Sequence, residues 1–260
     1  MIARAVAFVN AMGDFRVIRT RMETPMPRLD ATEALAAFPD FRVAAMVIEG
    51  AGAPDSRAPA IEAYVAAAEQ NCRARWSGME LSAIPGVAAW RRAYKGFGIK
   101  STSYRSSVER LVKRVLAGGD LPRVNGFVDL YNAVSLEHVV CAGADDLDAV
   151  TGDLAFRFAR EGDTFIDMAP ADGMPPEQPP KPGEVVYADG STVLCRRWNW
   201  RQDARSIVTP RTRRIVLTIQ SNGVGSVEDA ARDVERLARE ALGMQSRVVI
   251  AEKERPVVEF

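Results

Sequence analysis

The sequence predicts an α+β fold in which a mixed sheet is flanked by helices. Three observations lead to this prediction. Apolar residues recur at the helical period through the first half of the 260-residue chain, and the second half changes to short apolar runs and period-two alternation. A further amphipathic segment near the end closes the pattern, and helices followed by strands with a closing helix are typical of this class.

The first half contains one predicted strand and four predicted helices. The apolar run over residues 42–49, bounded by Pro39 and Gly50, predicts a buried strand. Apolar residues three and four apart then predict helices at about 59–75, around 87–94, at about 103–117 and over 127–134. Gly118-Gly119 supplies a C-cap for the third of these helices.

The second half is rich in predicted strands. Short apolar or alternating segments predict strands at 153–160, 184–188, 192–197, 215–220 and 247–251. Asp189-Gly190 predicts a tight hairpin between the second and third of them, because a primed turn needs residues that tolerate positive φ. The proline-rich stretch 170–183 is predicted to be a surface loop. A late helix is predicted from its N-cap Ser226 to Leu242, with Gly243 after its end.

The chain divides into three predicted parts. Residues 1–37 are predicted to be an N-terminal extension, because Thr24-Pro25-Met26-Pro27 interrupts any regular element and the segment has no sustained period. Residues 38–245 are predicted to form the main domain, and residues 246–260 a C-terminal strand or tail.

Composition excludes several classes of protein. Because 34 basic side chains balance 34 acidic ones, a uniformly basic nucleic-acid-binding coat is excluded. The three cysteines and the single histidine, His138, form no CxxC or HExxH motif, so we expect no metal, no cofactor and no disulfide framework. The chain has neither a secretory start nor an apolar stretch near eighteen residues, so we expect a cytoplasmic protein without a membrane partner.

The charges are nevertheless segregated along the chain. Residues 91–114 hold eight basic side chains and one acid, and residues 196–214 hold seven arginines and one acid. Residues 137–167 hold eight acids and two arginines. Two interpretations stay open: the basic segments form a face that binds a polyanion such as RNA, or they pair with the acidic segment across the fold.

The densest group of candidate functional residues lies at 196–202. If this stretch continues a strand, Trp198 and Trp200 point to one side, and Arg197, Asn199 and Arg201 point to the other. Aromatic rings can stack on bases, and guanidinium groups can bind phosphate or carboxylate. The alternative is that both tryptophans belong to the core and the arginines form a solvated face.

A second group of polar residues lies on the helix predicted over 127–134. Asp129, Asn132 and Ser135 are spaced three apart and therefore share one side of that helix. Such a polar seam can order a water molecule for hydrolysis, or it can satisfy backbone groups at the helix ends. Lys95 precedes the glycine-containing stretch 96–102, which suggests either an anion contact or a turn between helices.

Several motifs resemble those of a known family. Residues 122–136 (PRVNGFVDLYNAVSL) and 143–148 (GADDLD) resemble the B3/B4 domain of the phenylalanyl-tRNA synthetase β subunit, and more closely the freestanding bacterial proteins made of that domain alone. The segments 95–98, 103–109, 183–189 and 195–201 also resemble the freestanding group. The resemblance covers about residues 38–219, which is most of the chain.

The resemblance implies an editing activity. In the synthetase this domain hydrolyses tyrosine wrongly attached to the phenylalanine tRNA, and a freestanding copy would act in trans. Editing is needed because a hydrophobic pocket discriminates an added hydroxyl by only about a hundredfold. The implied mechanism is attack of a positioned water on the aminoacyl ester, assisted by the terminal ribose hydroxyl. The synthetase motif has a histidine where this sequence has about Gly143, and the acid that selects the tyrosine hydroxyl has only Asp203 near its place. The resemblance therefore does not imply tyrosine specificity, and a different aminoacyl ester, a smaller one or a free metabolite stay open as ligands.

On this basis the sequence predicts a trans-editing aminoacyl-tRNA deacylase, with a non-catalytic module that binds tRNA, RNA or an amino-acid-like metabolite as the alternative. Asp129, Asn132 and Asn199 are predicted to line the reacting water and ester. Substrate and tRNA are predicted to contact six further residues: Lys95, Ser135, Arg197, Trp198, Trp200 and Arg201. Both functions require that the helix of Asp129 and the segment of Trp198 meet at one cavity.

Overall fold

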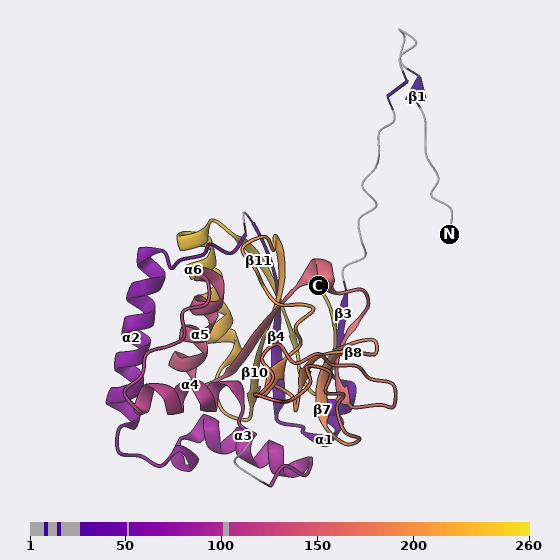
Figure 1. Cartoon of the computed structure of the whole chain (residues 1–260). Helices are drawn as coiled ribbons and strands as arrows, with labels where there is room; N and C mark the ends of the chain where they lie inside the picture. Colours follow the sequence, from indigo (N-terminus) through magenta and orange to yellow (C-terminus); the bar gives the residue numbers. More distant parts are fainter. Residues whose placement is uncertain (1–7, 10–14, 17–26, 51, 101–103) are drawn as a thin grey trace.

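Helices and two β-sheets form the layers of the molecule, so the α+β prediction is confirmed (Figure 1). The computed structural model describes residues 8–9, 15–16, 27–50, 52–100 and 104–260. Helices α2, α4, α5 and α6 lie together on one side of β4 and β10 in Figure 1, and β7 and β8 lie on the other side. No helix in these ranges is both long enough and apolar enough to span a membrane.

The first sheet has four antiparallel strands in the order β11-β4-β10-β5. The predicted strand at 42–49 is β4 (Phe41–Glu49), which pairs with β10 (Arg214–Asn222) and β11 (Gln245–Ala251), and β10 pairs with β5 (Cys141–Asp146). Helix α6 covers one face of β4, while on the other face the Phe41 ring meets Phe156 of the second sheet at 5.2 Å. Because both faces are covered, the apolar run of β4 is continuous and does not alternate.

The second sheet is mixed and has six strands in the order β12-β3-β6-β7-β8-β9. The strands are β12 (Val257–Glu259), β3 (Arg28–Asp30), β6 (Leu154–Phe158), β7 (Val185–Asp189), β8 (Thr192–Arg196) and β9 (Arg201–Gln202), and only β3 and β6 run parallel. The hairpin predicted at Asp189-Gly190 joins β7 to β8, with Gly190 at φ 55°. Two short strands, β1 (Phe8–Val9) and β2 (Phe15–Arg16), pair with each other.

The described residues form six helices: five in the predicted order, with two changes at their ends, and α1, which lies in the segment predicted to be an extension. They are α1 (Thr32–Ala37), α2 (Pro59–Trp76), α3 (Pro85–Gly96), α4 (Ser107–Leu116), α5 (Gly126–His138) and α6 (Val227–Leu242), with single 3-10 turns η1 (Leu81–Ala83) and η2 (Leu147–Ala149). Helix α4 begins at Ser107 because the Ser106 hydroxyl caps it, accepting from the Glu109 amide at 3.4 Å. The predicted start at residue 103 lies outside the described residues.

Helix α5 is longer than its apolar spacing predicts. The Asn125 side chain accepts from the amides of Phe127 and Val128 at 3.1 and 2.9 Å and so fixes the first turn. The helix continues to His138 and ends where Val139 takes a left-handed conformation, with φ 53°. This start and length set which residues of α5 face the neighbouring strand β5.

The three-part division of the chain stays a prediction. Strand β3 belongs to the predicted extension and β12 to the predicted tail. The two strands nevertheless pair antiparallel at the edge of the six-stranded sheet. Leu29 of β3 is fully buried, and β11 pairs with β4 along seven residues. We therefore propose that the domain includes residues 28–37 and 246–260.

Candidate functional site

A cavity of about 480 Å³ opens beside β5 and β9, the edge strands of the two sheets. Gln202 of β9 joins the two edges, since its Nε2 donates to the carbonyl oxygen of Ala144 on β5 at 2.6 Å. Helices α4 and α5 and strands β7, β8 and β10 supply the other walls. The cavity therefore brings together segments that lie between residues 107 and 220 of the chain.

A chain of side-chain amides and hydroxyls lines one wall of the cavity through Asn199, Thr218 and Gln220, and Tyr94 supports it from behind that wall. The Tyr94 hydroxyl donates to Asn199 Oδ1 at 2.9 Å, and Asn199 Nδ2 donates to Gln220 Oε1 at 3.2 Å. Gln220 Nε2 in turn donates to the Thr218 hydroxyl at 3.0 Å. Because each group holds the next, the amide of Asn199 has one orientation and its position is fixed.

Asp145 places a buried carboxyl group in the same cavity. The side chain comes from β5, and its Oδ1 accepts from the Ser206 hydroxyl at 2.6 Å and from Gln202 Nε2 at 3.0 Å. Burial raises the pKa of Asp145 to about 7, against the opposing effect of these two hydrogen bonds, and the nearby carboxylates of Asp203 and Asp146 raise it further. The group can therefore be charged or neutral near neutral pH.

Aromatic and cationic side chains gather at one end of the cavity. The Trp200 ring lies under the guanidinium groups of Arg197 and Arg201, with 4.5 and 4.8 Å from each Cζ to the ring centroid. The Tyr104 ring packs edge-on against Trp200 at 5.1 Å. Arg110 is exposed at this end and donates to the Trp200 carbonyl oxygen at 3.3 Å. The opening of the cavity thus carries cations and ring faces.

Four of the nine predicted site residues line the cavity: Asn132, Asn199, Trp200 and Arg201. Asn132 is half-buried on α5, and its amide makes no hydrogen bond to any described residue. Arg201 also pairs with Asp167 at 3.2 Å. The helix of Asp129 and the segment of Trp198 do meet at one cavity, through Asn132 and Asn199 respectively.

The other predicted residues lie elsewhere. Asp129 is buried in an ion pair with Arg57 at 2.7 Å, and its other oxygen accepts from the Val124 amide. The Ser135 hydroxyl donates to the carbonyl oxygen of Val140 at 2.5 Å, next to the end of α5. Lys95 is exposed and lines a second pocket, on α3. Neither Asp129 nor Ser135 lines the cavity.

The predicted strand alternation over 196–202 is wrong. Strand β8 ends at Arg196, and a turn follows in which Arg197 and Trp198 take left-handed conformations, with φ of 45° and 68°. Trp198 is therefore directed into the core, where its ring meets Phe38, Phe41 and Trp90 at 4.8 to 5.2 Å. The side chains of Trp198 and Trp200 therefore point in different directions, because side chains alternate between two faces in a strand but not in a turn.

Arg197 is also buried, although the sequence predicts that it contacts substrate. Its Nη2 pairs with Glu184 at 3.0 Å, and its Cζ lies 3.8 Å from the centroid of the Tyr104 ring. Burial lowers the pKa of Arg197, and Glu184 opposes this shift. The side chain thus supports the aromatic residues at the cavity opening and is not itself exposed to solvent there.

Sequence reasoning missed Asp145, Tyr187, Gln202 and Gln220 as site residues. A signal was present for three of them. Asp145 and Tyr187 stand inside the family segments at 143–148 and 183–189. Thr218 and Gln220 place polar groups at alternate positions of a mainly apolar strand. Buried polar residues at period two indicate a polar wall inside the molecule.

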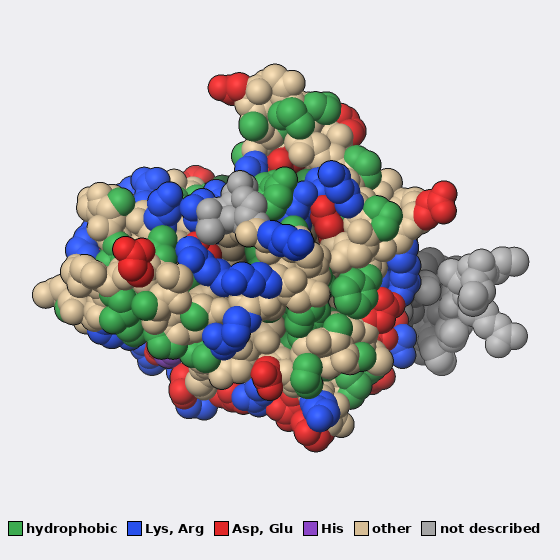
Figure 2. Space-filling view, turned by 90° about the horizontal axis from the view of Figure 1, so that it is seen from below, with side chains coloured by type: hydrophobic (Ala, Val, Ile, Leu, Met, Phe, Trp, Pro, Cys, Tyr) green, Lys and Arg blue, Asp and Glu red, His purple; other side chains and the backbone are tan. Residues whose placement is uncertain are grey.

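The charge segregation has a mixed outcome. Arg201 and Arg214 pair with Asp167 and Asp148 of the acidic segment, as the pairing interpretation predicts. Within residues 91–114, two arginines pair with Glu109 of the same segment. Six cations there are exposed and have no ion pair among the described residues: Arg92, Lys95, Lys100, Arg110, Lys113 and Arg114. Figure 2 shows basic side chains gathered on the face seen from below, where α3 lies in Figure 1.

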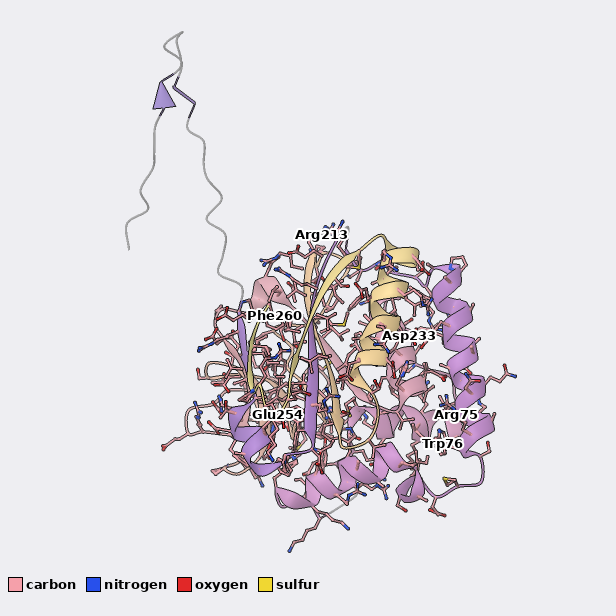
Figure 3. The ribbon with its side chains drawn as sticks, turned by 180° about the vertical axis from the view of Figure 1, so that it is seen from behind. Arg75, Trp76, Arg213, Asp233, Glu254 and Phe260 are labelled. Atoms are coloured by element: carbon pink, nitrogen blue, oxygen red, sulfur yellow. The ribbon has the colours of Figure 1, made fainter. Side chains whose placement is uncertain are left out.

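The single histidine is part of a separate cluster. His138 Nε2 lies 2.8 Å from Asp233 of α6, and Asp233 also accepts from the Tyr64 hydroxyl at 2.9 Å. Asp233 is labelled in Figure 3. Contact with His138, Arg236 and Tyr64 holds the pKa of Asp233 below its ordinary value, although burial acts in the opposite direction. This cluster joins α2, α5 and α6. No group of three or more His, Cys, Asp or Glu side chains in the described ranges is arranged to hold a metal ion.

Comparison with known proteins gives a family and a distant structural neighbour. The model of the B3/4 domain family matches residues 89–258. A solved structure of an N-terminal fragment of the phenylalanyl-tRNA synthetase β subunit from Pyrococcus horikoshii matches with 14% identity and a TM-score of 0.38. The match covers 47% of this chain and 41% of that chain, so this chain spans less than half of its neighbour. No curated protein matches the sequence.

Proposed function

Because the chain belongs to the B3/4 domain family, we propose that it hydrolyses the ester bond of mischarged aminoacyl-tRNA in trans. The observation that carries the proposal is the cavity with an amide wall and a cationic opening. Its volume of about 480 Å³ lies in the range of small-molecule sites and suits an aminoacyl group with its ribose.

Asn132 is the side chain best suited to hold the reacting water. Its amide lines the cavity and makes no hydrogen bond to a described residue, so both its oxygen and its nitrogen are free to bind water and the ester carbonyl. The attacking water adds to the carbonyl carbon, and the bond between that carbon and the ribose oxygen breaks. The ribose oxygen takes up the proton that the attacking water gives up, which leaves a free amino acid and an intact terminal ribose.

The remaining residues have supporting parts in the proposal. Asn199 is fixed by Tyr94 and Gln220 and lines the wall on which the ester lies. Trp200 offers a ring face to the terminal base, and Arg201 and Arg110 offer positive charge to its phosphate. Lys95 belongs to the exposed basic face beside α3, which would contact the RNA backbone further from the ester. Asp129, Ser135 and Trp198 have structural parts only.

A non-catalytic binding module is the second candidate. The observation in its favour is that Asn199 and Gln220 already bond to each other and to Tyr94 and Thr218. Amides whose hydrogen bonds are already made within the protein have less capacity to bind a reacting group, although they still shape the pocket. On this alternative the cavity holds an amino-acid-like group without reacting with it.

The proposal predicts ester hydrolysis that depends on Asn132. The full-length protein is mixed with tRNAs that carry each noncognate amino acid, and the ester that remains is followed over time. We expect hydrolysis of at least one aminoacyl-tRNA, and a rate reduced by about a hundredfold for Asn132→Ala, because one positioned hydrogen-bonding group is typically worth this much.

The matched control is Asn71→Ala, which removes an exposed helix amide outside the cavity and should leave the rate unchanged. If no ester is hydrolysed while tRNA still binds, the binding module is the correct function. If tRNA does not bind and a free amino acid does, the protein is a metabolite-binding module.

A further inference from the structure

We propose that Asp145 binds the α-ammonium group of the aminoacyl ligand, so that the cavity accepts aminoacyl groups with a free amine and excludes N-acylated ones. The inference rests on the proposed function, because it specifies the substrate class of the same cavity. Its basis is that the cavity holds a carboxyl group without a cationic partner, that of Asp145, and a hydroxyl group without a hydrogen-bond partner, that of Tyr187.

Most buried carboxyl groups of the described chain have a cationic partner, and Asp145 does not. Seven buried acids lie within 4.0 Å of an arginine nitrogen: Glu69, Glu109, Asp129, Asp163, Asp167, Glu184 and Asp203. Asp145 and Asp189 have no such arginine. Asp189 lies outside the cavity and accepts from the amide and hydroxyl groups of Thr151.

The two oxygens of Asp145 have different surroundings. Oδ1 accepts from both Ser206 and Gln202, whereas Oδ2 accepts from no described residue. Because Asp145 lines the cavity, its unused oxygen is available to a ligand there. The fold thus fixes the carboxyl group through one oxygen and leaves the other free.

No arginine or lysine nitrogen of the described residues lies within 4.0 Å of Asp145, although Arg110 and Arg201 line the same cavity. Tyr131 of α5, Tyr187 of β7 and Cys195 of β8 are all close enough for the Asp145 charge to raise their pKa values. The carboxylates of Asp146 and Asp203 act on Asp145 with the same sign. A buried carboxylate without a counter-charge is costly, and a ligand cation would supply the missing charge.

Tyr187 supplies the second, independent observation. Its side chain is 2% exposed and lines the cavity, yet its hydroxyl has no hydrogen-bond partner among the described residues. Buried hydroxyl groups are normally satisfied, so an unsatisfied one in a cavity wall indicates a ligand group. An ammonium has three donors, and Asp145 Oδ2 and the Tyr187 oxygen are two acceptors without a partner in the same cavity lining. Tyr187 and Asp145 together therefore suit a primary amine.

A different role for Asp145 would be that of a general base for the attacking water. The two roles predict different effects of N-acylation. A base is needed equally for substrates with and without a free amine, whereas an ammonium site distinguishes them. The test therefore compares ligands with and without an N-acetyl group.

The test measures binding of ligands that cannot be hydrolysed. The probes are 3′-aminoacylamino-3′-deoxyadenosines, one for each of the twenty amino acids, each prepared with and without an N-acetyl group. Titration calorimetry is carried out at pH 7.5 with the full-length wild type, Asp145→Asn and the control Asp189→Asn. Asparagine retains the oxygen that accepts from Ser206 and Gln202, and thermal melting checks that each variant folds.

For the best-binding probe, we expect N-acetylation to weaken binding to the wild type by at least about tenfold, because it removes one partner of a buried charge pair. Asp145→Asn should abolish this preference, and Asp189→Asn should retain it. Equal binding of both forms by the wild type, or no binding of any probe, would overturn the proposal without the need for a variant. An unchanged preference in Asp145→Asn would also overturn it.

The outcomes separate this inference from the proposed function. If the amide probes bind with the expected preference but no aminoacyl-tRNA is hydrolysed, the deacylase function fails and the ammonium site stands. If esters are hydrolysed equally well with and without N-acetylation, the deacylase function stands and the ammonium site fails.

Discussion

At the scale of single residues, Asp145 makes the stability of the protein depend on pH. Burial raises its pKa in the folded state from the ordinary 3.8 to about 7. Between about pH 4 and pH 7 the folded state therefore holds a proton that the unfolded state has released. Protons bound only by the folded state stabilise it, so this contribution to the free energy of unfolding falls as pH rises across that window.

The expected outcome for Asp145→Asn is a stability gain that grows with pH. Asparagine cannot ionise, so the variant lacks the cost of a buried charge, which is about 1.4 kcal/mol for each unit of pKa shift. Urea unfolding at pH 4.5, 6 and 7.5 measures the difference in free energy of unfolding between wild type and variant. The titration of other groups is common to both proteins and cancels in this difference. A difference that is the same at all three values would contradict the placement of this carboxyl group.

Trp198 and Trp200 show what residue patterns leave undecided. The sequence predicts that both contact substrate, and the alternative places both in the core. The structure divides them, with Trp198 fully buried and Trp200 beside the cavity. The cause is the left-handed backbone at Arg197 and Trp198, which no side-chain period reveals.

At the scale of secondary-structure elements, the first turn of α5 is fixed by a buried ion pair. Asp129 pairs with Arg57, and both side chains are less than 5% exposed. The same carboxylate accepts from the Val124 amide at 2.9 Å and lies near the positive end of the helix. These contacts position the start of α5 and, through it, Asn132.

We expect Asp129→Ala to reduce stability and not the chemistry itself. Removing one partner of a buried pair leaves Arg57 with only the exposed Glu62, at 3.5 Å, as a counter-charge and costs about 3 kcal/mol. Denaturant unfolding measures this decrease. Activity per folded molecule should stay within severalfold of the wild type, and a variant with normal stability but no hydrolysis would instead restore Asp129 as a catalytic residue.

Element boundaries were predictable where capping residues mark them. Ser226 and Gly243 enclose α6 as the sequence predicts, with Gly243 at φ 64°. Helix α4 begins later than its apolar spacing predicts, because Ser106 caps it. Apolar spacing reports a buried face, whereas the first hydrogen-bonded turn depends on which side chain can accept from the free amides.

At the scale of the whole molecule, a chain with zero formal charge presents a basic face. The exposed cations on and after α3 lie on the surface that also carries the second pocket. RNA binding through phosphates releases counterions and therefore weakens as salt rises. The basic face should determine this salt dependence if tRNA is the partner.

The variant Arg92→Gln/Lys95→Gln/Lys100→Gln should bind tRNA more weakly. The slope of log affinity against log salt concentration should be smaller in magnitude by about one for each phosphate that the variant no longer neutralises. The control is Arg232→Gln/Arg239→Gln, which removes two exposed cations from α6. Filter binding between 50 and 200 mM salt measures both. Equal slopes for the basic-face variant and the wild type would exclude this face as the tRNA-binding surface.

Apart from α1 and β5, which it did not predict, the sequence by itself determined the order and type of the main elements, the α+β class, the Asp189-Gly190 hairpin and the family motifs. These features depend on local spacing, capping and turn residues, which neighbours in the chain decide. Only the tertiary structure decided which polar side chains share the cavity. Asp145, Tyr187 and Asn199 come from β5, β7 and the turn before β9, and they meet because the edges of two sheets come together. Burial then gives Asp145 its raised pKa, which no local pattern of residues records.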